Sequence, residues 1–358
     1  MSVRARDLGL PLPGETGPHN AITDVPGVLV GMTTLLEPEG RIRTGVTAIL
    51  PHPPEQGPRP VWAGLSVLNG NGEMTGAHWV RDGGYLVGPV MITNTHSVGI
   101  VHHGTVRWMI RRWAEAFGDR HLWAMPVVAE TYDGVLNDIN GLHVGEDHAI
   151  AAIEAAASGP VAEGNVGGGT GMIAYEFKAG TGTASRRVRT AGRDGTVGVL
   201  VQANHGRRPW FTVLGVPVGR ELAEGSFRSA DQGSIIVVIA TDLPLLPHQL
   251  DRVARRAALG LARGGTPGGN SSGDLFLAFS TANPMPMPEL APPLWRLEAL
   301  ADDGLDPLYL AVVESVEEAI LNAMLAARPL VALKPAGHRV PALDGERLLS
   351  ILRRAGRL

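Results

Sequence analysis

Residues 231–242 read Asp-Gln-Gly-Ser-Ile-Ile-Val-Val-Ile-Ala-Thr-Asp. The apolar, β-branched run that follows Ser234 is typical of a buried strand. The Gly233-Ser234 pair puts a hydroxyl at the start of that strand. A serine in this position can be a nucleophile and can also be the residue that follows a scissile bond. Gly and Ser also begin many strands and turns, so this segment taken alone indicates no more than a strand start.

Similar short apolar runs alternate with glycine-rich turns along the chain, and four of them are predicted as buried strands. These are 45–50, 88–92, 195–202 and 234–240. Apolar spacing and stop signals predict four helices. These are 106–117, 147–157, 248–261 and 315–327. The mixture indicates an α/β or α+β fold in which helices cover sheets.

Two proline-rich stretches, 51–60 and 283–293, are predicted to be extended surface loops. Composition does not change across either of them, so neither marks a domain boundary. Residues 1–358 are therefore expected to form one domain. The polar segment 219–233 is a third predicted loop, placed directly before Ser234, where an exposed processing loop would have to lie.

The composition bounds the classes of protein to consider. With 358 residues and 44% hydrophobic residues, the chain can bury a large core. A net charge of -4 argues against nucleic acid or an acidic membrane as the main partner. The absence of cysteine excludes disulfides, thiolate nucleophiles and cysteine metal sites. The N-terminus lacks the apolar core of a signal peptide and no apolar run could span a bilayer, so a cytoplasmic protein is expected.

A cut before Ser234 would have a chemical consequence. An amide hydrolase needs a nucleophile, a base to take its proton and donors for the oxyanion. Without cysteine, the nucleophile is Ser, Thr or a metal-bound water. A freed α-amine on Ser234 would have an ordinary pKa of about 7.7 to 8.0, so one residue would supply both nucleophile and base without a histidine.

Seven further motifs, rich in Gly, Asn, Ser, Thr and acidic residues, accompany the 231–242 segment. They are 4–9, 20–28, 68–76, 92–99, 130–134, 164–172 and 270–274. In this order, the set resembles the DmpA-type aminopeptidases from about Arg4 to the end of the chain. The resemblance implies a four-layer αββα sandwich of two sheets between helical layers, a fold shared with ornithine acetyltransferases.

The resemblance also implies an activity. Members of this family cleave themselves in front of a serine, which here would give an α chain of 1–233 and a β chain of 234–358. They hydrolyse N-terminal residues from short peptides, amides and esters through an acyl-enzyme, and some accept D-residues or β-amino acids. The resemblance implies no cofactor and no metal, and it implies a homotetramer of processed heterodimers.

By the same resemblance, Gly233 and Ser234 form the cleavage site and Ser234 is the nucleophile. Ser272 and Asp274 match the residues that hydrogen-bond around the nucleophile and help to relay its proton. Asn204 matches the donor to the oxyanion. The alternative for Ser272 and Asp274 is an ordinary Asn-Ser-Ser-Gly-Asp turn, and Asn204 could be a left-handed turn residue.

Tyr132 and Glu130 match positions that line the pocket, where the Glu130 carboxylate would bind the substrate's ammonium group. A half-buried strand end is the alternative reading of both residues. Asp242 and Asp138 are expected to act as structural caps or hydrogen-bond acceptors.

Three other patterns are interpreted as structural. The Gly-rich 167–171 segment lacks the spacing of a phosphate-binding loop. The histidines at 102, 103, 143 and 148 lack metal-ligand spacing. The basic 186–189 run has no aromatic neighbours, so nucleic-acid binding has little support. Two rival functions stay open: an acyltransferase like the ornithine acetyltransferases, and an unprocessed, non-catalytic binding protein.

Overall fold

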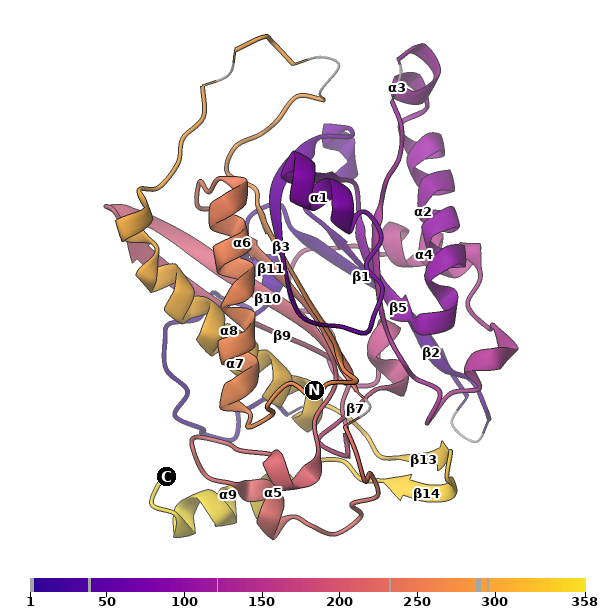
Figure 1. Cartoon of the computed structure of the whole chain (residues 1–358), viewed down its shortest axis with the longest axis vertical. Helices are drawn as coiled ribbons and strands as arrows, with labels where there is room; N and C mark the ends of the chain where they lie inside the picture. Colours follow the sequence, from indigo (N-terminus) through magenta and orange to yellow (C-terminus); the bar gives the residue numbers. More distant parts are fainter. Residues whose placement is uncertain (1–2, 38–39, 121, 232, 288–290, 295) are drawn as a thin grey trace.

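The computed structural model describes residues 3–37, 40–120, 122–231, 233–287, 291–294 and 296–358. Gln232 and residues 288–290, which belong to two of the predicted loops, lie outside this part of the chain. Two β-sheets face each other, and helices cover the outer face of each (Figure 1). This arrangement is the αββα sandwich expected from the sequence.

The larger sheet has six strands in the order β4-β3-β12-β11-β10-β9. Its strands are β3 (Pro60–Gly70), β4 (Tyr85–Val87), β9 (Thr181–Thr190), β10 (Arg193–Asn204), β11 (Ser234–Thr241) and β12 (Gly273–Ser280). Strand β11 runs antiparallel to β10 and parallel to β12. The strand that begins with Ser234 therefore lies in the middle of the sheet.

The smaller sheet has four strands in the order β1-β2-β5-β6. They are β1 (Leu29–Leu36), β2 (Arg43–Leu50), β5 (Val90–Asn94) and β6 (Val127–Thr131). Two short hairpins complete the strands of the described chain: β7 (Ile173–Ala174) with β8 (Phe177–Lys178), and β13 (Leu330–Leu333) with β14 (Ala336–Val340). The four strands predicted from the sequence lie within or overlap β2, β5, β10 and β11.

The helices of the described residues are α1 (Ala77–Gly83), α2 (Val98–Arg112), α3 (Ala114–Asp119), α4 (Glu146–Glu154), α5 (Val218–Glu221), α6 (Pro247–Arg255), α7 (Ala257–Arg263), α8 (Asp306–Leu325) and α9 (Gly345–Arg354). Helices α6 and α8 pack on the six-stranded sheet, with α7 against α8, and α2 and α4 pack on the four-stranded sheet (Figure 1). No helix of the described residues is long and apolar enough to cross a membrane.

Strand β11 shows why its sequence is apolar without interruption. Ile235, Val237 and Ile239 belong to the core beneath α6, α7 and α8. The alternate residues Ile236 and Val238 belong to the core between the two sheets. Since successive side chains of a strand point to opposite faces, a strand covered on both faces has no solvent-facing position, which favours a continuous apolar run.

Two of the predicted helices begin too late. The helix expected over 106–117 is α2, which begins at Val98, followed after Trp113 by α3. Gly104 lies inside α2 and makes the first part of this helix difficult to recognise from the sequence, because glycine is a poor helix former. In the structure a Cβ at this position would lie 2.9 Å from the carbonyl oxygen of Glu146, so the glycine permits close packing of α2 on α4. The helix expected over 315–327 is α8, which begins at Asp306. Most of α8 is buried, so its sequence has little amphipathic periodicity.

Other boundaries differ by less. The helix expected over 248–261 is divided at Arg256 into α6 and α7. The loop expected over 219–233 begins inside α5. Helix α9 was not predicted, although Asp344 caps it by accepting hydrogen bonds from the N–H groups of Glu346 and Arg347.

Candidate active site

Ser234 is the first residue of the central strand β11, and it lies where the end of β10 and the start of β12 meet the start of β11. In the register of the sheet it pairs with Asn204 at the end of β10 and with Gly273 at the start of β12. The next pair along β11 and β12 joins Ile235 to Asp274. Sheet pairing therefore brings Ser234, Asn204 and Asp274 together from three distant parts of the sequence.

The hydroxyl of Ser234 makes two hydrogen bonds to backbone. It donates to the carbonyl oxygen of Gly233 at 2.8 Å and accepts the N–H of Gly273 at 3.1 Å. Gly233 is closely packed, because a Cβ there would lie 2.1 Å from the carbonyl oxygen of Asn204. The contact from Gly273 was not predicted, since a backbone N–H leaves no signal in the residue type.

Ser272 and Asp274 form a buried pair beside Ser234. The Ser272 hydroxyl donates to Oδ1 of Asp274 at 2.6 Å, and the Asn69 amide donates to Oδ2 at 2.9 Å. Burial raises the pKa of Asp274, while these two hydrogen bonds act in the opposite direction. Among the described residues, the hydroxyl of Ser234 bonds only to Gly233 and Gly273, so the pair lies close to Ser234 in the sheet without a direct hydrogen bond to its hydroxyl.

Asn204 is buried, and its side-chain amide is held at both ends. Oδ1 accepts the N–H of Ile173 at 2.9 Å, and Nδ2 donates to the carbonyl oxygen of Tyr132 at 2.9 Å. An amide nitrogen carries two hydrogens, so the bond to Tyr132 uses one of the two. The amide of Asn204 is thus held in one orientation, on the residue that pairs with Ser234 in the sheet.

Glu130 approaches the site from the other sheet, near the end of β6. Its side chain accepts a hydrogen bond from the N–H of Glu73 at 2.9 Å and another from the hydroxyl of Thr95. Glu130 is 4% exposed, whereas Tyr132 is 39% exposed. Burial raises the pKa of Glu130, and the hydrogen bonds from Thr95 and Glu73 counteract this effect.

Of the predicted site residues, Glu130, Tyr132, Gly233 and Ser234 line a cavity of about 370 Å³, whereas Asn204, Ser272 and Asp274 are not among its lining residues. It is lined by Asn71, Thr95, Glu130, Tyr132, Gly233, Ser234 and Ser271. A carboxylate from one sheet therefore shares a small cavity with a serine hydroxyl from the other, which suits a substrate that carries both an ammonium group and a carbonyl. Asn71 and Thr95 stand in motifs that the sequence singled out, but no role was predicted for them.

The glycine-rich segment and two of the histidines make contacts within the chain. Residues Gly167–Gly171 form a buried 3-10 turn. His103 approaches Glu146 at 3.5 Å and His143 approaches Asp138 at 3.8 Å. The described residues contain no group of three or more His, Cys, Asp or Glu that could hold a metal ion.

Two charged residues have structural partners. Arg186 of the basic 186–189 run is buried and bonds to Glu318 at 2.7 Å and Glu314 at 3.3 Å. Asp242 is a structural acceptor as expected, since it accepts the N–H of Thr196 at 2.7 Å.

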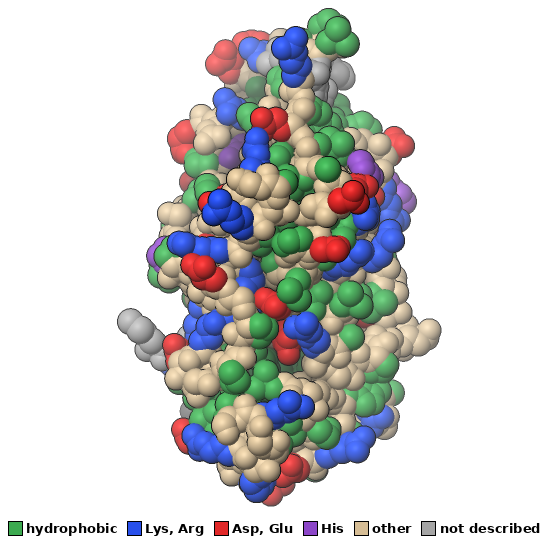
Figure 2. Space-filling view, turned by 90° about the vertical axis from the view of Figure 1, so that its left-hand side faces the viewer, with side chains coloured by type: hydrophobic (Ala, Val, Ile, Leu, Met, Phe, Trp, Pro, Cys, Tyr) green, Lys and Arg blue, Asp and Glu red, His purple; other side chains and the backbone are tan. Residues whose placement is uncertain are grey.

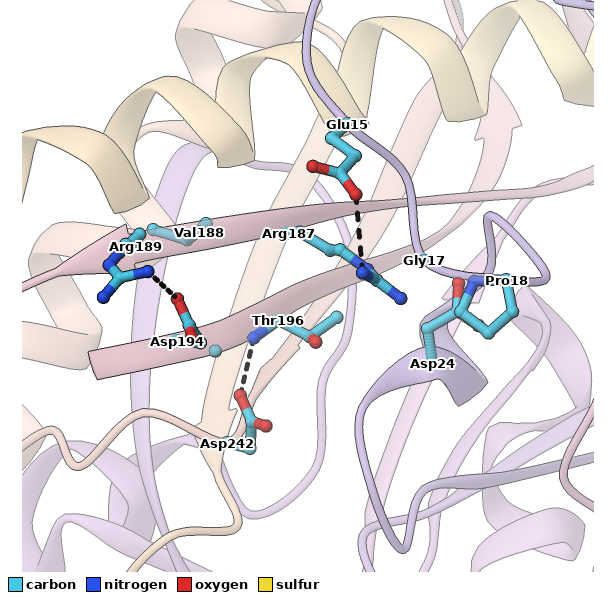
Figure 3. Close-up of a pocket in the computed structure, with 11 residues that line it drawn as sticks. Glu15, Gly17, Pro18, Asp24, Arg187, Val188, Arg189, Asp194, Thr196 and Asp242 are labelled. Carbon is cyan, nitrogen blue, oxygen red and sulfur yellow. Dashed lines mark hydrogen bonds and ion pairs between the residues drawn. The ribbon is translucent and has the colours of Figure 1, made fainter. Parts of the chain in front are cut away.

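A larger cavity of about 610 Å³ lies at the opposite end of β10 from Asn204. Both of its arginines are paired within the chain, Arg187 with Glu15 and Arg189 with Asp194 (Figure 3). Figure 2 shows acidic and basic side chains interspersed over the side of the molecule that lies at the left in Figure 1. This face presents no broad field of one sign.

Known proteins resemble this chain in fold and in sequence over almost its whole length. The structure of an L-aminopeptidase D-Ala-esterase/amidase from Ochrobactrum anthropi, described as a prototype for the serine aminopeptidases and a variant of the Ntn-hydrolase fold, is 58% identical. It matches with a TM-score of 0.96 over 99% of both chains. A β-aminopeptidase from Burkholderia sp. is 49% identical and matches with a TM-score of 0.90 over 99% of both chains.

A sequence relative supports the same class. Beta-peptidyl aminopeptidase BapA from Sphingosinicella microcystinivorans is 49% identical over 99% of this chain and 93% of its own length. The fold and site thus define a hydrolase of the serine aminopeptidase class, with the Ntn-hydrolase fold. The chain belongs to peptidase family S58, whose model matches residues 20–337. The comparisons do not favour an acyltransferase or a non-catalytic binding protein.

Proposed function

We propose that the chain is made as a precursor, cuts itself between Gly233 and Ser234, and then hydrolyses N-terminal residues from short peptides, amides or esters. The observation that carries this proposal is the position of the Ser234 hydroxyl. It lies 2.8 Å from the carbonyl oxygen of Gly233 and receives the N–H of Gly273 at 3.1 Å. The side chain is therefore adjacent to the bond that must break and to a backbone donor.

Self-cleavage begins with attack of Oγ of Ser234 on the carbonyl carbon of Gly233. The C–N bond breaks, the nitrogen becomes the free α-amine of Ser234, and the acyl group passes to the hydroxyl as an ester. Water then hydrolyses the ester and releases the carboxylate of Gly233. The products are the α chain 1–233 and the β chain 234–358, and Ser234 now carries its own base.

In the mature enzyme, that α-amine takes the hydroxyl proton as Ser234 attacks the carbonyl of the substrate's first residue. The N–H of Gly273 and the amide of Asn204 stabilise the oxyanion, as preorganised donors do. Glu130 binds the substrate's ammonium group, and Tyr132 lines the pocket. The proton passes to the leaving amine, and water releases the acyl-enzyme.

Asp274 stabilises the ammonium group that forms when the Ser234 amine takes the hydroxyl proton, because a nearby carboxylate stabilises a cation. Asp274 is buried and hydrogen-bonded on both oxygens, which keeps it in one orientation. Ser272 extends the pair toward the nucleophile as a second hydroxyl.

The two fragments stay together after the cut in this proposal. Strands β11 and β12 of the β chain are the central pair of the larger sheet, with β10 and β3 of the α chain on their two sides. Each fragment thus depends on the other for its sheet hydrogen bonds and for its core. The family resemblance extends the proposal to a homotetramer of such heterodimers.

The substrate class rests on the relatives. The Sphingosinicella protein is named for β-peptides, and the Ochrobactrum protein for L-amino acid and D-alanine substrates. A panel of p-nitroanilides and esters of L-, D- and β-amino acids therefore covers the chemistry of the proposed pocket.

The test is the intact mass of the denatured wild type and of Ser234→Ala, followed by the panel. We expect two wild-type fragments that meet between Gly233 and Ser234, a single mutant chain, and hydrolysis by the wild type alone. An uncut and inactive wild type would overturn both cleavage and mechanism. Cleavage without hydrolysis of any of these substrates would overturn the substrate class alone.

A further inference from the structure

Lys178 is a buried lysine for which the proposed mechanism has no role. It is one of two lysines in the sequence, the other being Lys334, and it is 0% exposed. Its Nζ donates to three backbone carbonyl oxygens: that of Met172 at 3.0 Å, that of Ala179 at 2.5 Å and that of Gly169 at 3.5 Å. Three acceptors match the three donors of an ammonium group.

A lysine in this position is costly to the fold. Burial lowers the pKa of Lys178 well below its ordinary value, which is the sign that the charged form loses hydration. An apolar side chain of similar length would fill the same space without that cost. The ammonium can donate to all three carbonyl groups, and the neutral amine keeps two N–H donors for them.

The contact with Met172 connects Lys178 to the active site. The carbonyl of Met172 and the N–H of Ile173 belong to one peptide group. Nζ of Lys178 donates to the carbonyl oxygen of this peptide group at 3.0 Å. The N–H of the same peptide group, which belongs to Ile173, donates to Oδ1 of Asn204 at 2.9 Å. The other end of the Asn204 amide donates to Tyr132 at the edge of the cavity.

This chain of contacts orients the Asn204 amide, with Oδ1 toward the N–H of Ile173 and Nδ2 toward the carbonyl oxygen of Tyr132. The two ends of an asparagine amide have nearly the same shape, and only the hydrogen-bond partners distinguish oxygen from nitrogen. Rotation of the 172–173 peptide would remove the donor to Oδ1 and leave the amide held at one end only, by the bond from Nδ2 to the carbonyl oxygen of Tyr132. The second hydrogen of Nδ2 would then be oriented less tightly toward the oxyanion.

We propose that Lys178 is a positioning residue, which locks the 172–173 peptide and thereby holds the Asn204 amide as a donor to the oxyanion. This proposal rests on the proposed role of Asn204. Hydrogen bonds in series also polarise one another, so the contact strengthens the donor as well as orienting it. The rest of the chain uses arginine almost exclusively, but a planar guanidinium directs its donors into one plane. The tetrahedral amine of a lysine can reach carbonyls on three sides.

Lys178→Met removes the donors and keeps the length of the side chain. We expect kcat to fall about tenfold, less than the 10² to 10³ typical of losing an oxyanion donor itself, with KM within about twofold of the wild type. Lys178→Gln keeps an N–H donor and should retain more activity than Lys178→Met. Lys334→Met makes the same chemical change at an exposed site and should leave kcat unchanged.

A double-mutant cycle with Asn204→Ala separates this role from a purely structural one. If Lys178 acts through Asn204, Lys178→Met should change kcat less than twofold in the Asn204→Ala background. An equal loss in both backgrounds, or wild-type kcat in Lys178→Met, would overturn the proposal. Self-cleavage uses the same oxyanion, so the rate of fragment formation is measured in the same four proteins and serves where a variant does not mature.

The cycle also distinguishes this inference from the proposed function. Failure of the proposed function shows in the wild type, which would be uncut and inactive. Failure of the inference shows only in the variants, in a wild type that is cut and active. If Lys178→Met does not fold, the comparison of Lys178→Gln with wild type in the two backgrounds gives the same decision.

Discussion

The amide of Asn69 donates to Oδ2 of Asp274 at 2.9 Å. This bond joins the neighbouring strands β3 and β12 of the larger sheet. In the proposed mature enzyme this bond connects the α chain to the β chain. It also stabilises the charged form of Asp274, in opposition to the burial that raises the pKa of this carboxyl group.

Removing this donor should shift the acidic limb of the pH profile. Asn69→Leu deletes a hydrogen bond to the charged form of Asp274, so the pKa of the carboxyl group should rise further. If the charged form is the active one, the acidic limb of kcat/KM moves to higher pH. Asp274→Asn should abolish that limb and lower kcat at every pH. The measurement is kcat/KM from pH 4 to pH 9, and an unchanged limb in Asn69→Leu would contradict the assignment.

Gly233→Ala should prevent self-cleavage. The added Cβ would lie 2.1 Å from the carbonyl oxygen of Asn204, so the Gly233 carbonyl must move away from the Ser234 hydroxyl. Gly118→Ala is the matched control: its Cβ meets nothing within 4 Å, it lies in α3, and alanine is a better helix former than glycine. Time courses of fragment formation should show an uncut Gly233→Ala chain and normal cleavage of Gly118→Ala.

Glu130→Gln should raise KM for substrates with a free amino group by about tenfold or more, because a charge-assisted hydrogen bond is lost. Esters that lack this amino group should show little change, and they serve as the control. Equal effects on both kinds of substrate would remove Glu130 from the role of ammonium anchor.

The same anchor should make KM depend on pH. Burial raises the pKa of Glu130, so its charge is lost as the pH falls through a value above the ordinary 4.3 or so of glutamate. KM should therefore rise at mildly acidic pH in the wild type and stay flat in Glu130→Gln. Thr95→Val removes a hydrogen bond that lowers this pKa, so the rise in KM should begin at higher pH.

The sequence predicted the strands better than the helices, for a physical reason. Strand β11 is a short, wholly apolar run bounded by turn residues, and burial on both faces leaves this signature intact. Helix α8 is also buried over most of its surface, but burial erases the periodicity from which a helix is recognised. Gly104 acts in the same direction, since a glycine needed for helix contact looks like a helix breaker.

The sequence motifs predicted side chains of the candidate site, but they did not predict its backbone groups. Ser234, Asp274 and Glu130 were predicted because their residue types and order match a family. The N–H of Gly273 and the 172–173 peptide carry no such mark, because every residue except proline has an N–H. Their positions depend on the pairing of β11 with β12 and on a turn far from Asn204 in sequence, so only the folded chain shows them.

Asp133 should make the stability of the protein depend on pH. Burial raises its pKa to about 6, although hydrogen bonds from neighbours, among them Asn137 at 3.1 Å, favour the charged form. The pKa in the unfolded chain is about 3.9, so between these values the native state binds more protons than the unfolded state. The contribution of Asp133 to the free energy of unfolding is therefore most favourable below about pH 4, and it falls as the pH rises to about 6.

Asp133→Asn removes this ionisation, and the comparison is made in Ser234→Ala so that both proteins are single chains. The free energy of unfolding of Asp133→Asn relative to its parent should rise by up to about 3 kcal/mol between pH 4 and pH 7, since about two pKa units correspond to that energy. Urea denaturation at a series of pH values measures the difference. A difference that stays constant with pH would show that Asp133 titrates alike in the folded and unfolded chains, and that its neighbours offset the whole cost of burial.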